Sequence, residues 1–275
     1  MIFCTKCGTQ LNDDANFCAK CGTPVSKAAP SVPSTSVSSA SLNSTSGGTG
    51  SKGTMSDAYI HYASKRYSEA AVIFREHADQ GDPEAMYRLS TCYMCGQGVG
   101  QNYDTAAQWN LKAAENGFAD AYYYAGLDYE LGNGGNVNKK LAFEWYLKAA
   151  NNGNAQAQNK VGIFYELGDS IEKNYKLAFE WYLKSAQQGY ADAQTNAGLF
   201  YAMGRGVEQN GKLAFEWTKK AVDQGDARAY SVIGLLYFEG IGVTKDEKKA
   251  VEYWKIGAEK GEENCKDYLK QFNAW

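Results

Sequence analysis

The sequence lacks the side-chain patterns that identify most enzymes. Only two histidines, His61 and His77, occur among its 275 residues. It has no Gly-x-Ser-x-Gly nucleophile turn, no phosphate-binding glycine loop and no metal-binding helix motif. Phosphate-binding loops precede a helix, whereas Gly-x-Gly-Val segments such as residues 204–207 follow a predicted helix. These segments therefore predict turns. We therefore expect a protein that is not an enzyme.

Long apolar runs and an excess of basic residues are also missing. No stretch approaches the roughly 18 consecutive apolar residues that a membrane span needs. Residues 57–275 carry 24 Lys and Arg against 29 Asp and Glu, which disfavours a dedicated nucleic-acid binder. Cysteines occupy the N-terminal positions where a signal peptide has its apolar core, so we expect a cytoplasmic protein without membrane contact.

Repetition dominates what the sequence does contain. A 36-residue unit, clearest at residues 193–228, occurs five times without a break. Every copy begins with alanine, which we number repeat position 1, and the copies span residues 85–120, 121–156, 157–192, 193–228 and 229–264. A fixed period of this size predicts a solenoid, because a single unit cannot bury its apolar face without its neighbours.

Each unit predicts a helix hairpin. Repeat position 6 is glycine in four copies, which costs about 1 kcal/mol relative to alanine in a helix, so another helix should pass close to it. Position 9 is always tyrosine, whose ring can span the gap between helices. Glycine at position 12 should end the first helix, and Asn or Asp at position 18 should cap a second helix that ends before the glycine at position 33. The spacing predicts helices of roughly 11 and 13 residues.

In chain order, the shared pattern reads Ala, Leu-Gly, Tyr, Gly-x-Gly-Val, Asn or Asp, Lys-Ala, Trp-Tyr-x-Lys-Ala-Ala and Gly. This pattern resembles the Sel-one-like repeat, a relative of the tetratricopeptide repeat. The first copy departs from it at Ser90 and the third at Ser170, where other copies have glycine. The resemblance implies an all-α fold, a right-handed α-solenoid of helix hairpins. It also implies an adaptor or scaffold that binds other proteins.

Two Cys-x-x-Cys pairs stand near the N-terminus: Cys4, Cys7, Cys18 and Cys21. Each pair has the spacing of a metal knuckle, and four thiolates complete a tetrahedral site for one structural Zn²⁺ with no open position for catalysis. Two disulfides or a redox pair are the alternatives, and a cytosolic chain without a βαβ pattern disfavours both. Residues 1–26 resemble a short prokaryotic zinc ribbon, with Leu11 and Phe17 in its minimal core.

The remaining segments complete the predicted domain organisation. Residues 27–56 are rich in Ser, Thr and Gly and predict a flexible, disordered linker. Residues 57–84 predict a divergent N-terminal hairpin, similar to a tetratricopeptide unit, with a truncated first helix. Residues 265–275 predict a C-terminal capping helix, because Lys270 stands where further stacking would require glycine.

A third Cys-x-x-Cys pair, Cys92 and Cys95, falls at positions 8 and 11 of the first repeat. Other copies have apolar residues there, such as Phe164 and Leu167. With no second pair nearby, packing is favoured over a zinc knuckle or a redox pair. His77 aligns with a packing alanine, which favours a structural role over catalysis.

By analogy with tetratricopeptide proteins, first-helix residues that vary between copies should contact a partner. They are Tyr87, Asp120, Tyr123, Glu130, Asn159, Glu166, Asp192 and Thr195, with Gln156, Arg228 and Ser231 at equivalent positions. Tyr123 with its acidic neighbours suits a polar or basic peptide. A solvated face that displays charges without binding anything is the alternative.

These features predict a protein–protein interaction adaptor that binds a protein or peptide on the concave face of the solenoid, with the zinc ribbon as a tethered second module. In one alternative the ribbon contacts nucleic acid while the solenoid recruits a regulatory partner, although Lys6 and Lys20 offer few phosphate contacts. A hydrolase, implied by distant secreted relatives of the repeat, is the second alternative, and the missing nucleophile–base pair disfavours it.

Overall fold

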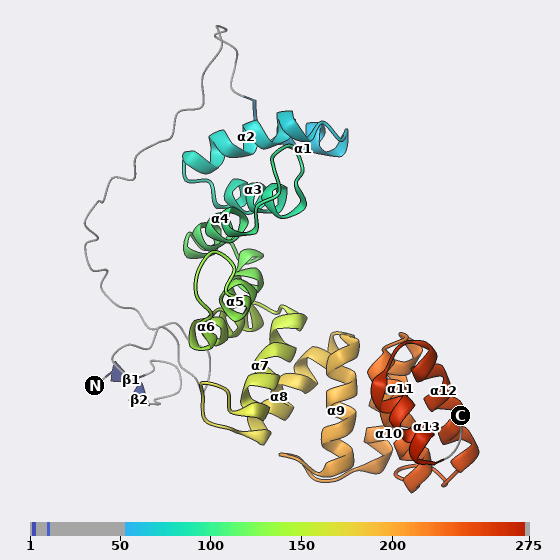
Figure 1. The fold of residues 1–275 in the computed structure, drawn as a ribbon. Coiled ribbons are helices and arrows are strands. Elements are labelled where there is room, and N and C mark those ends of the chain that lie inside the picture. The colour runs from blue at the N-terminus through green and yellow to red at the C-terminus, as the bar shows by residue number, and fades with distance from the viewer. Residues whose placement is uncertain (1, 4–9, 12–52, 273–275) are drawn as a thin grey trace, which may run out of the picture. The chain divides into compact units, whose positions relative to one another are not determined.

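The computed structural model describes residues 2–3, 10–11 and 53–272 (Figure 1). The chain divides into two compact units, Met1–Ala121 and Tyr122–Trp275. In the first unit, β1 (Ile2–Phe3) pairs antiparallel with β2 (Gln10–Leu11), so that Ile2 lies opposite Leu11. The described helices of this unit are α1 (Met55–Ala63), α2 (Tyr67–Asp79), α3 (Pro83–Cys95) and α4 (Tyr103–Glu115).

The second unit is built from helix hairpins. Its described helices are α5 (Ala121–Leu131), α6 (Lys139–Asn151), α7 (Ala155–Leu167), α8 (Tyr175–Gln187), α9 (Ala191–Met203), α10 (Gly211–Asp223), α11 (Ala227–Glu239), α12 (Glu247–Glu259) and α13 (Glu263–Gln271). In this unit α7, α9 and α11 each contact the second helix of their own repeat, and α6, α8 and α10 each contact the first helix of the next repeat. The predicted arrangement of helix hairpins is confirmed.

Side-chain and glycine caps set the helix ends where the sequence predicts them. The side chain at repeat position 18 accepts a hydrogen bond from the backbone N–H three residues further on, at Asn102, Asn138, Asn174, Asn210 and Asp246. The glycine at position 12 ends the first helix in the left-handed conformation, with φ between 65° and 72° at Gly96, Gly168, Gly204 and Gly240. Both sets of predicted caps are confirmed.

Close packing within each hairpin explains the glycine at repeat position 6. A Cβ atom added to Gly162 would lie 2.6 Å from two ring carbons of Tyr182, which is fully buried. Gly126 has the same relation to the ring of Tyr146. In the first copy, which has Ser90 instead of glycine, the residue equivalent to these tyrosines is the smaller Asn110. The close approach predicted from the glycines is therefore present.

Successive hairpins interlock through the tyrosine at repeat position 9. Tyr201 of α9 packs edge-on against Phe179 of α8, with ring centroids 5.0 Å apart and an interplanar angle of 82°. The same contact recurs at 5.5 Å in two further pairs, Phe143–Tyr165 and Phe215–Tyr237. Each pair joins a second helix to the first helix of the next repeat, so these rings hold neighbouring hairpins of the second unit in register.

Five helix starts differ from the predictions. α3, α7, α9 and α11 each have 13 residues rather than 11, because they begin two residues before repeat position 1. Polar N-caps that the 36-residue pattern did not single out, Asp82, Asn154 and Asp226, cap α3, α7 and α11 there, whereas α9 begins after Tyr190 without a side-chain cap. α1 begins at Met55, inside the predicted linker, because Thr54 and Asp57 form a reciprocal capping box.

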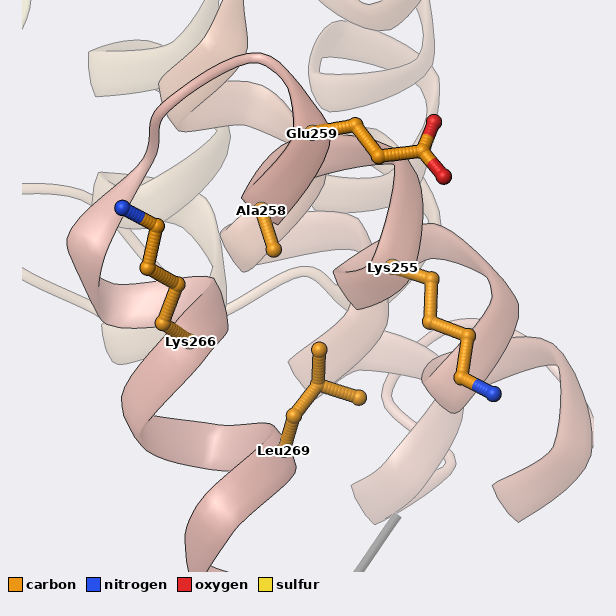
Figure 2. A pocket seen from close by; sticks show the side chains of 5 residues that line it. All are labelled: Lys255, Ala258, Glu259, Lys266 and Leu269. Carbon is orange, nitrogen blue, oxygen red and sulfur yellow. The ribbon is translucent and has the colours of Figure 1, made fainter. Parts of the chain in front are cut away.

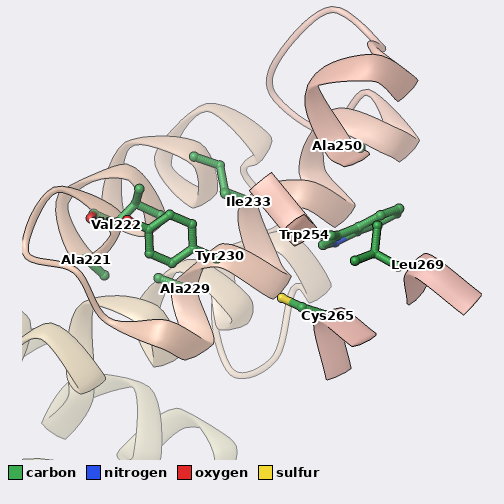
Figure 3. Close-up of a cluster of buried hydrophobic side chains, with 9 residues drawn as sticks. All are labelled: Ala221, Val222, Ala229, Tyr230, Ile233, Ala250, Trp254, Cys265 and Leu269. Atoms are coloured by element: carbon green, nitrogen blue, oxygen red, sulfur yellow. Dashed lines mark hydrogen bonds between the residues drawn. The ribbon is translucent and has the colours of Figure 1, made fainter. Parts of the chain in front are cut away.

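The C-terminal helix buries apolar side chains against the last complete hairpin. Cys265 and Leu269 of α13 are fully buried with Trp254 of α12, in a cluster that also contains Ile233 of α11 (Figure 3). The Tyr268 ring adds to this cluster, 5.0 Å from the Trp254 ring. Burial raises the pKa of the Cys265 thiol to about 12, so this cysteine is a packing residue rather than a nucleophile.

The packing interpretation of the third cysteine pair is correct for Cys92 and wrong for Cys95. Cys92 is buried, but Cys95 is exposed. The apolar residues at the same repeat position are also exposed, by 60% at Leu131, 61% at Leu167 and 54% at Met203. Position 11 is the last helical residue before the glycine cap, beyond the part of the first helix that the second helix covers. His77 has a structural contact, since its Nε2 atom lies 3.0 Å from the carbonyl oxygen of Gly53.

Candidate partner-binding site

Contacts in the second unit link side chains of α5, α7, α9 and α11 into one surface, which we call the first-helix face. Its members are Tyr123 and Glu130 of α5, Asn159, Lys160 and Glu166 of α7, Asp192 and Asn196 of α9, and Arg228 of α11. Five of these eight residues belong to the predicted partner-binding set. The repeat spacing places them on equivalent turns of successive helices, so one side chain can reach the next repeat.

The Glu130 carboxylate contacts one side chain of its own repeat and one of the next repeat. The hydroxyl of Tyr146, which is fully buried, donates to Glu130 Oε2 at 2.5 Å. The ammonium of Lys160 lies 2.8 Å from the same oxygen. About a quarter of each charged side chain remains exposed. Glu130 is thus a fixed, partly neutralised acceptor rather than a mobile surface charge.

Glu166 repeats this arrangement one hairpin later. The buried Tyr182 hydroxyl donates to Glu166 Oε2 at 2.6 Å, and an Arg205 nitrogen lies 3.5 Å from Oε1. Burial, and then the hydrogen bond to the carboxylate, raises the pKa of the Tyr182 hydroxyl, while the nearby Arg228 opposes this rise. Arg228 of α11 therefore lies close to the α7–α8 hairpin, although 46 residues separate it from Tyr182.

A chain of side-chain hydrogen bonds crosses the centre of the first-helix face. Arg228 Nη2 donates to Asn196 Oδ1 at 2.7 Å, and Asn196 Nδ2 donates to Asn159 Oδ1 at 2.9 Å. Asn159 and Asn196 are 5% and 6% exposed, whereas Arg228 is exposed. Three successive first helices, α7, α9 and α11, are therefore connected by one polar network with a charged end at the surface.

Tyr123 and Asp192 lie close together although they come from different repeats. Burial raises the pKa of the half-buried Tyr123 hydroxyl, and the charges of Glu130 and Asp192 add to this rise. Asp192 accepts a hydrogen bond from the Tyr190 hydroxyl at 2.8 Å. The acidic surroundings of Tyr123 that the sequence predicted are therefore present on this face.

Two predicted contact residues are buried. Thr195 has no exposed surface, and its hydroxyl donates to Asp226 Oδ2 at 2.5 Å. Asn159 is 95% buried in the polar network described above. The repeat period places both on the correct side of their helices, but the next hairpin covers them. Thr195 supports the first-helix face from beneath, and Asn159 leaves only a small part of its side chain at the surface.

Tyr87 and Asp120 belong to the first unit. Tyr87 is half-buried, with its ring centroid 5.2 Å from that of Phe118 and 5.8 Å from the guanidinium of Arg88. Asp120 is exposed at the end of the loop after α4.

Sequence reasoning missed several members of the site. Lys160 and Asn196 follow predicted residues by one position, at a repeat position that also varies between copies. Leu131 and Leu167 directly follow Glu130 and Glu166, and with Met203 they form an exposed apolar row. The signal for this row was an apolar residue at the last helical position before a glycine in three copies, which sequence reasoning assigned to packing, although the fifth copy has Glu239 there.

The cavity of about 390 Å³ between α12 and α13 has a different character (Figure 2). Ala258 and Leu269 line it together with the charged Lys255, Glu259 and Lys266. None of the residues predicted to bind a partner lines this cavity. Among the described residues there is also no group of three or more His, Cys, Asp or Glu side chains arranged to hold a metal ion.

The predicted zinc ligands, Cys4, Cys7, Cys18 and Cys21, lie outside the described residues. The paired strands β1 and β2 flank the first Cys-x-x-Cys pair in the sequence, with Phe3 opposite Gln10. This pairing brings Phe3 and Gln10 next to each other, one on either side of the first pair in the sequence. In the part of the chain that the structure describes, no helix is long and apolar enough to cross a membrane.

Family comparisons cover most of the chain. Residues 3–25 match a zinc-ribbon domain, and the Sel1 repeat matches five consecutive segments, residues 83–118, 119–154, 155–190, 191–226 and 227–262. These segments have the 36-residue period found in the sequence and begin two residues before each unit defined above. A search of curated proteins returned no match.

Solved structures show the same fold. A Sel1 repeat protein from Oxalobacter formigenes is 33% identical with a TM-score of 0.70, and the alignment covers 77% of this chain and 84% of that one. The protective antigen c5321 of uropathogenic Escherichia coli strains, which displays an SLR fold, is 28% identical with a TM-score of 0.69. That alignment covers 78% of this chain and 48% of the antigen.

Proposed function

Because this chain belongs to the Sel1-repeat family, whose α-solenoid fold commonly mediates protein–protein interaction, we propose that it is an adaptor that binds a protein partner on the first-helix face. The proposed role is binding without catalysis. The partner would contact the outer side chains of α5, α7, α9 and α11 in the second unit. We assign the concave side predicted from the sequence to this face.

The exposed apolar row carries this proposal. Leu131, Leu167 and Met203 recur every 36 residues and are each more than half exposed. Glycine caps follow them directly, so their backbone is fixed, and the adjacent carboxylates of Glu130 and Glu166 are held by hydrogen bonds. A surface that combines fixed apolar and polar groups loses little conformational entropy when it binds, which favours association with an extended protein segment.

Replacing the apolar row tests the proposal. A triple variant, Leu131→Ser, Leu167→Ser and Met203→Ser, should fold like the wild-type protein, because all three side chains are exposed. The full-length chain and this variant are compared for the proteins that they capture from the source lysate, identified by mass spectrometry. Partners of the first-helix face should be captured by the wild type and lost from the variant.

The matched control changes exposed apolar residues elsewhere. Val137 is 57% exposed and Ile256 is 40% exposed, and neither belongs to the apolar row. The variant Val137→Ser with Ile256→Ser should capture the same partners as the wild type. Equal capture by the wild type and the triple variant would place recognition elsewhere in the chain and reject the proposed face.

The N-terminal cysteines form the second proposed module. Cys4, Cys7, Cys18 and Cys21 would hold one structural Zn²⁺, in keeping with the zinc-ribbon match at residues 3–25. A four-thiolate site is coordinatively closed, so the metal would stabilise the ribbon and would not supply catalysis. The cytoplasm, where thiols stay reduced, is the compartment that suits these cysteines.

A further inference from the structure

The polar network on the first-helix face has a fixed direction. A guanidinium group can only donate hydrogen bonds, so Asn196 must present its Oδ1 atom to Arg228. Asn196 therefore presents its Nδ2 atom to Asn159, which must accept through Oδ1. The orientation of both amides follows from the arginine alone, and it leaves Asn159 Nδ2 as a donor at the far end of the network.

Both ends of this network retain N–H groups that donate to no described protein atom. Asn159 is 95% buried, and the hydrogen bond from Asn196 is its one partner among the described residues. The Arg228 side chain donates to Asn196, and no carboxylate in the part of the chain that the structure describes lies within 4.0 Å of its guanidinium. Asn159 Nδ2 keeps some access to solvent and the Arg228 side chain is exposed, so both donors can reach a ligand that supplies oxygen atoms.

The acidic residues of the face do not fill this need, because each already accepts from another donor. Glu130 accepts from Tyr146 and Lys160, Glu166 accepts from Tyr182, and Asp192 accepts from Tyr190. Asp226, two residues before Arg228, accepts from Thr195 and from the backbone N–H of Arg228. The guanidinium of Arg228 is therefore the cation of this face that has no carboxylate partner.

We infer that the first-helix face binds an extended peptide segment that places an acidic side chain against Arg228 and a backbone carbonyl oxygen against Asn159 Nδ2. This inference rests on the proposed function and names the chemistry of its partner. It revises the sequence-based expectation of a basic peptide, because the carboxylates that suggested one are already hydrogen-bonded. The carboxylate would receive charge-assisted hydrogen bonds from a guanidinium already oriented by Asn196.

Peptide pools with one fixed position test this chemistry. Two pools of random dodecapeptides, acetylated and amidated at their ends, carry either Glu or Gln at a central position. A third pool carries central Gln and a free C-terminal carboxylate. Immobilised full-length protein selects from each pool, and recovery is measured by mass spectrometry. We expect recovery of the Glu pool to exceed that of the amidated Gln pool about tenfold, the contribution of a charge-assisted hydrogen bond.

Variants assign the preference to the network. Arg228→Gln removes the charge at an exposed position, and Asn159→Asp replaces the free Nδ2 donor with an oxygen of the same size. Arg228→Gln should abolish the preference for the Glu pool, whereas Asn159→Asp should lower the recovery of both capped pools, and circular dichroism should show unchanged helix content for each variant. Lys212→Gln on α10 removes a cation whose side chain is 84% exposed, and it should leave the preference intact.

Other outcomes overturn the inference in distinguishable ways. Equal recovery of the Glu and amidated Gln pools by the wild type would reject a carboxylate ligand while leaving peptide binding in place. Recovery of the free-acid pool alone would assign the site to a peptide C-terminus instead of an acidic side chain. No recovery from any pool would also reject it, and the serine variants of the apolar row would then show independently whether the first-helix face binds a protein.

Discussion

The close contact between Gly162 and Tyr182 leads to a quantitative prediction for Gly162→Ala. Alanine is favoured over glycine inside a helix by about 1 kcal/mol, so propensity alone would stabilise the variant. The new Cβ atom, however, would lie 2.6 Å from two carbons of the Tyr182 ring and 3.2 Å from the Ala178 carbonyl oxygen. Carbon atoms need about 3.5–4.0 Å, so the ring or the helix must shift by about 1 Å.

Tyr182 cannot move aside easily. Its side chain is fully buried, and its hydroxyl donates to Glu166 at 2.6 Å. Overpacking of this kind costs about 1–3 kcal/mol, and a ring fixed at both ends places the cost near the upper value. Gly162→Ala should therefore lower the free energy of unfolding by about 1–2 kcal/mol after the gain in helix propensity is subtracted.

Urea unfolding followed by far-ultraviolet circular dichroism measures this change. Hydrogen exchange of the α7 and α8 amides gives the local value in case the repeats unfold in stages. Gly135→Ala is the matched control, because its Cβ would meet no atom within 4 Å and its φ is not positive. A Gly162→Ala variant as stable as the wild type, or more stable, would refute the argument that the second helix excludes a side chain here.

The first repeat supplies a second test of the same contact, since it pairs Ser90 with Asn110 where the third repeat pairs Gly162 with Tyr182. In a double-mutant cycle of Gly162→Ser and Tyr182→Asn, the double variant should be more stable than the sum of the two single changes implies. The coupling should be about 1–2 kcal/mol. A coupling near zero would mean that the serine does not meet the ring.

Three further predictions concern the loops, the buried tyrosines and the metal. Ser170 adopts φ of +62° at a loop position where other copies have glycine. Ser170→Gly should therefore raise the free energy of unfolding by about 0.5–1 kcal/mol, measured by urea unfolding. The control Glu172→Gly, in the same loop, should not raise it. Burial, and then hydrogen bonds to glutamates, raises the pKa of the Tyr146 and Tyr182 hydroxyls above 10, so the unfolded chain ionises first. Their contribution to the free energy of unfolding is complete below pH 10 and falls above it by about 1.4 kcal/mol per pH unit for each tyrosine. Tyr182→Phe should therefore reduce the slope of unfolding free energy against pH above pH 10. An unchanged slope would contradict this. Finally, metal analysis of the full chain should find about one Zn²⁺ per molecule, and the variant with all four N-terminal cysteines changed to Ser should lose it while retaining its helix content.

The family assignment and the helix boundaries were largely predictable because they depend on local chemistry. Asn174 caps α8 and Gly168 ends α7 through contacts within a few residues of the chain, and each recurs every 36 residues. Glu130 and Tyr146 are 16 residues apart, and Glu166 and Tyr182 are also 16 residues apart, so the sequence repeats this Glu–Tyr pair at the same spacing. Repetition multiplies such local signals, so one unit can be checked against four others.

Exposure and partner choice were decided by the tertiary structure. The sequence shows that Thr195 and Leu167 both occur on first helices, but the packing of the next hairpin buries Thr195, while the end of the helix leaves Leu167 exposed. The chain of hydrogen bonds from Arg228 through Asn196 to Asn159 joins the three helices α7, α9 and α11, and no spacing within one repeat reveals it. The sequence by itself determined a repeated helix hairpin with its caps, because those depend on nearby residues. Only the stacking of the hairpins decided which side chains remain free to bind, because burial depends on the neighbouring repeat.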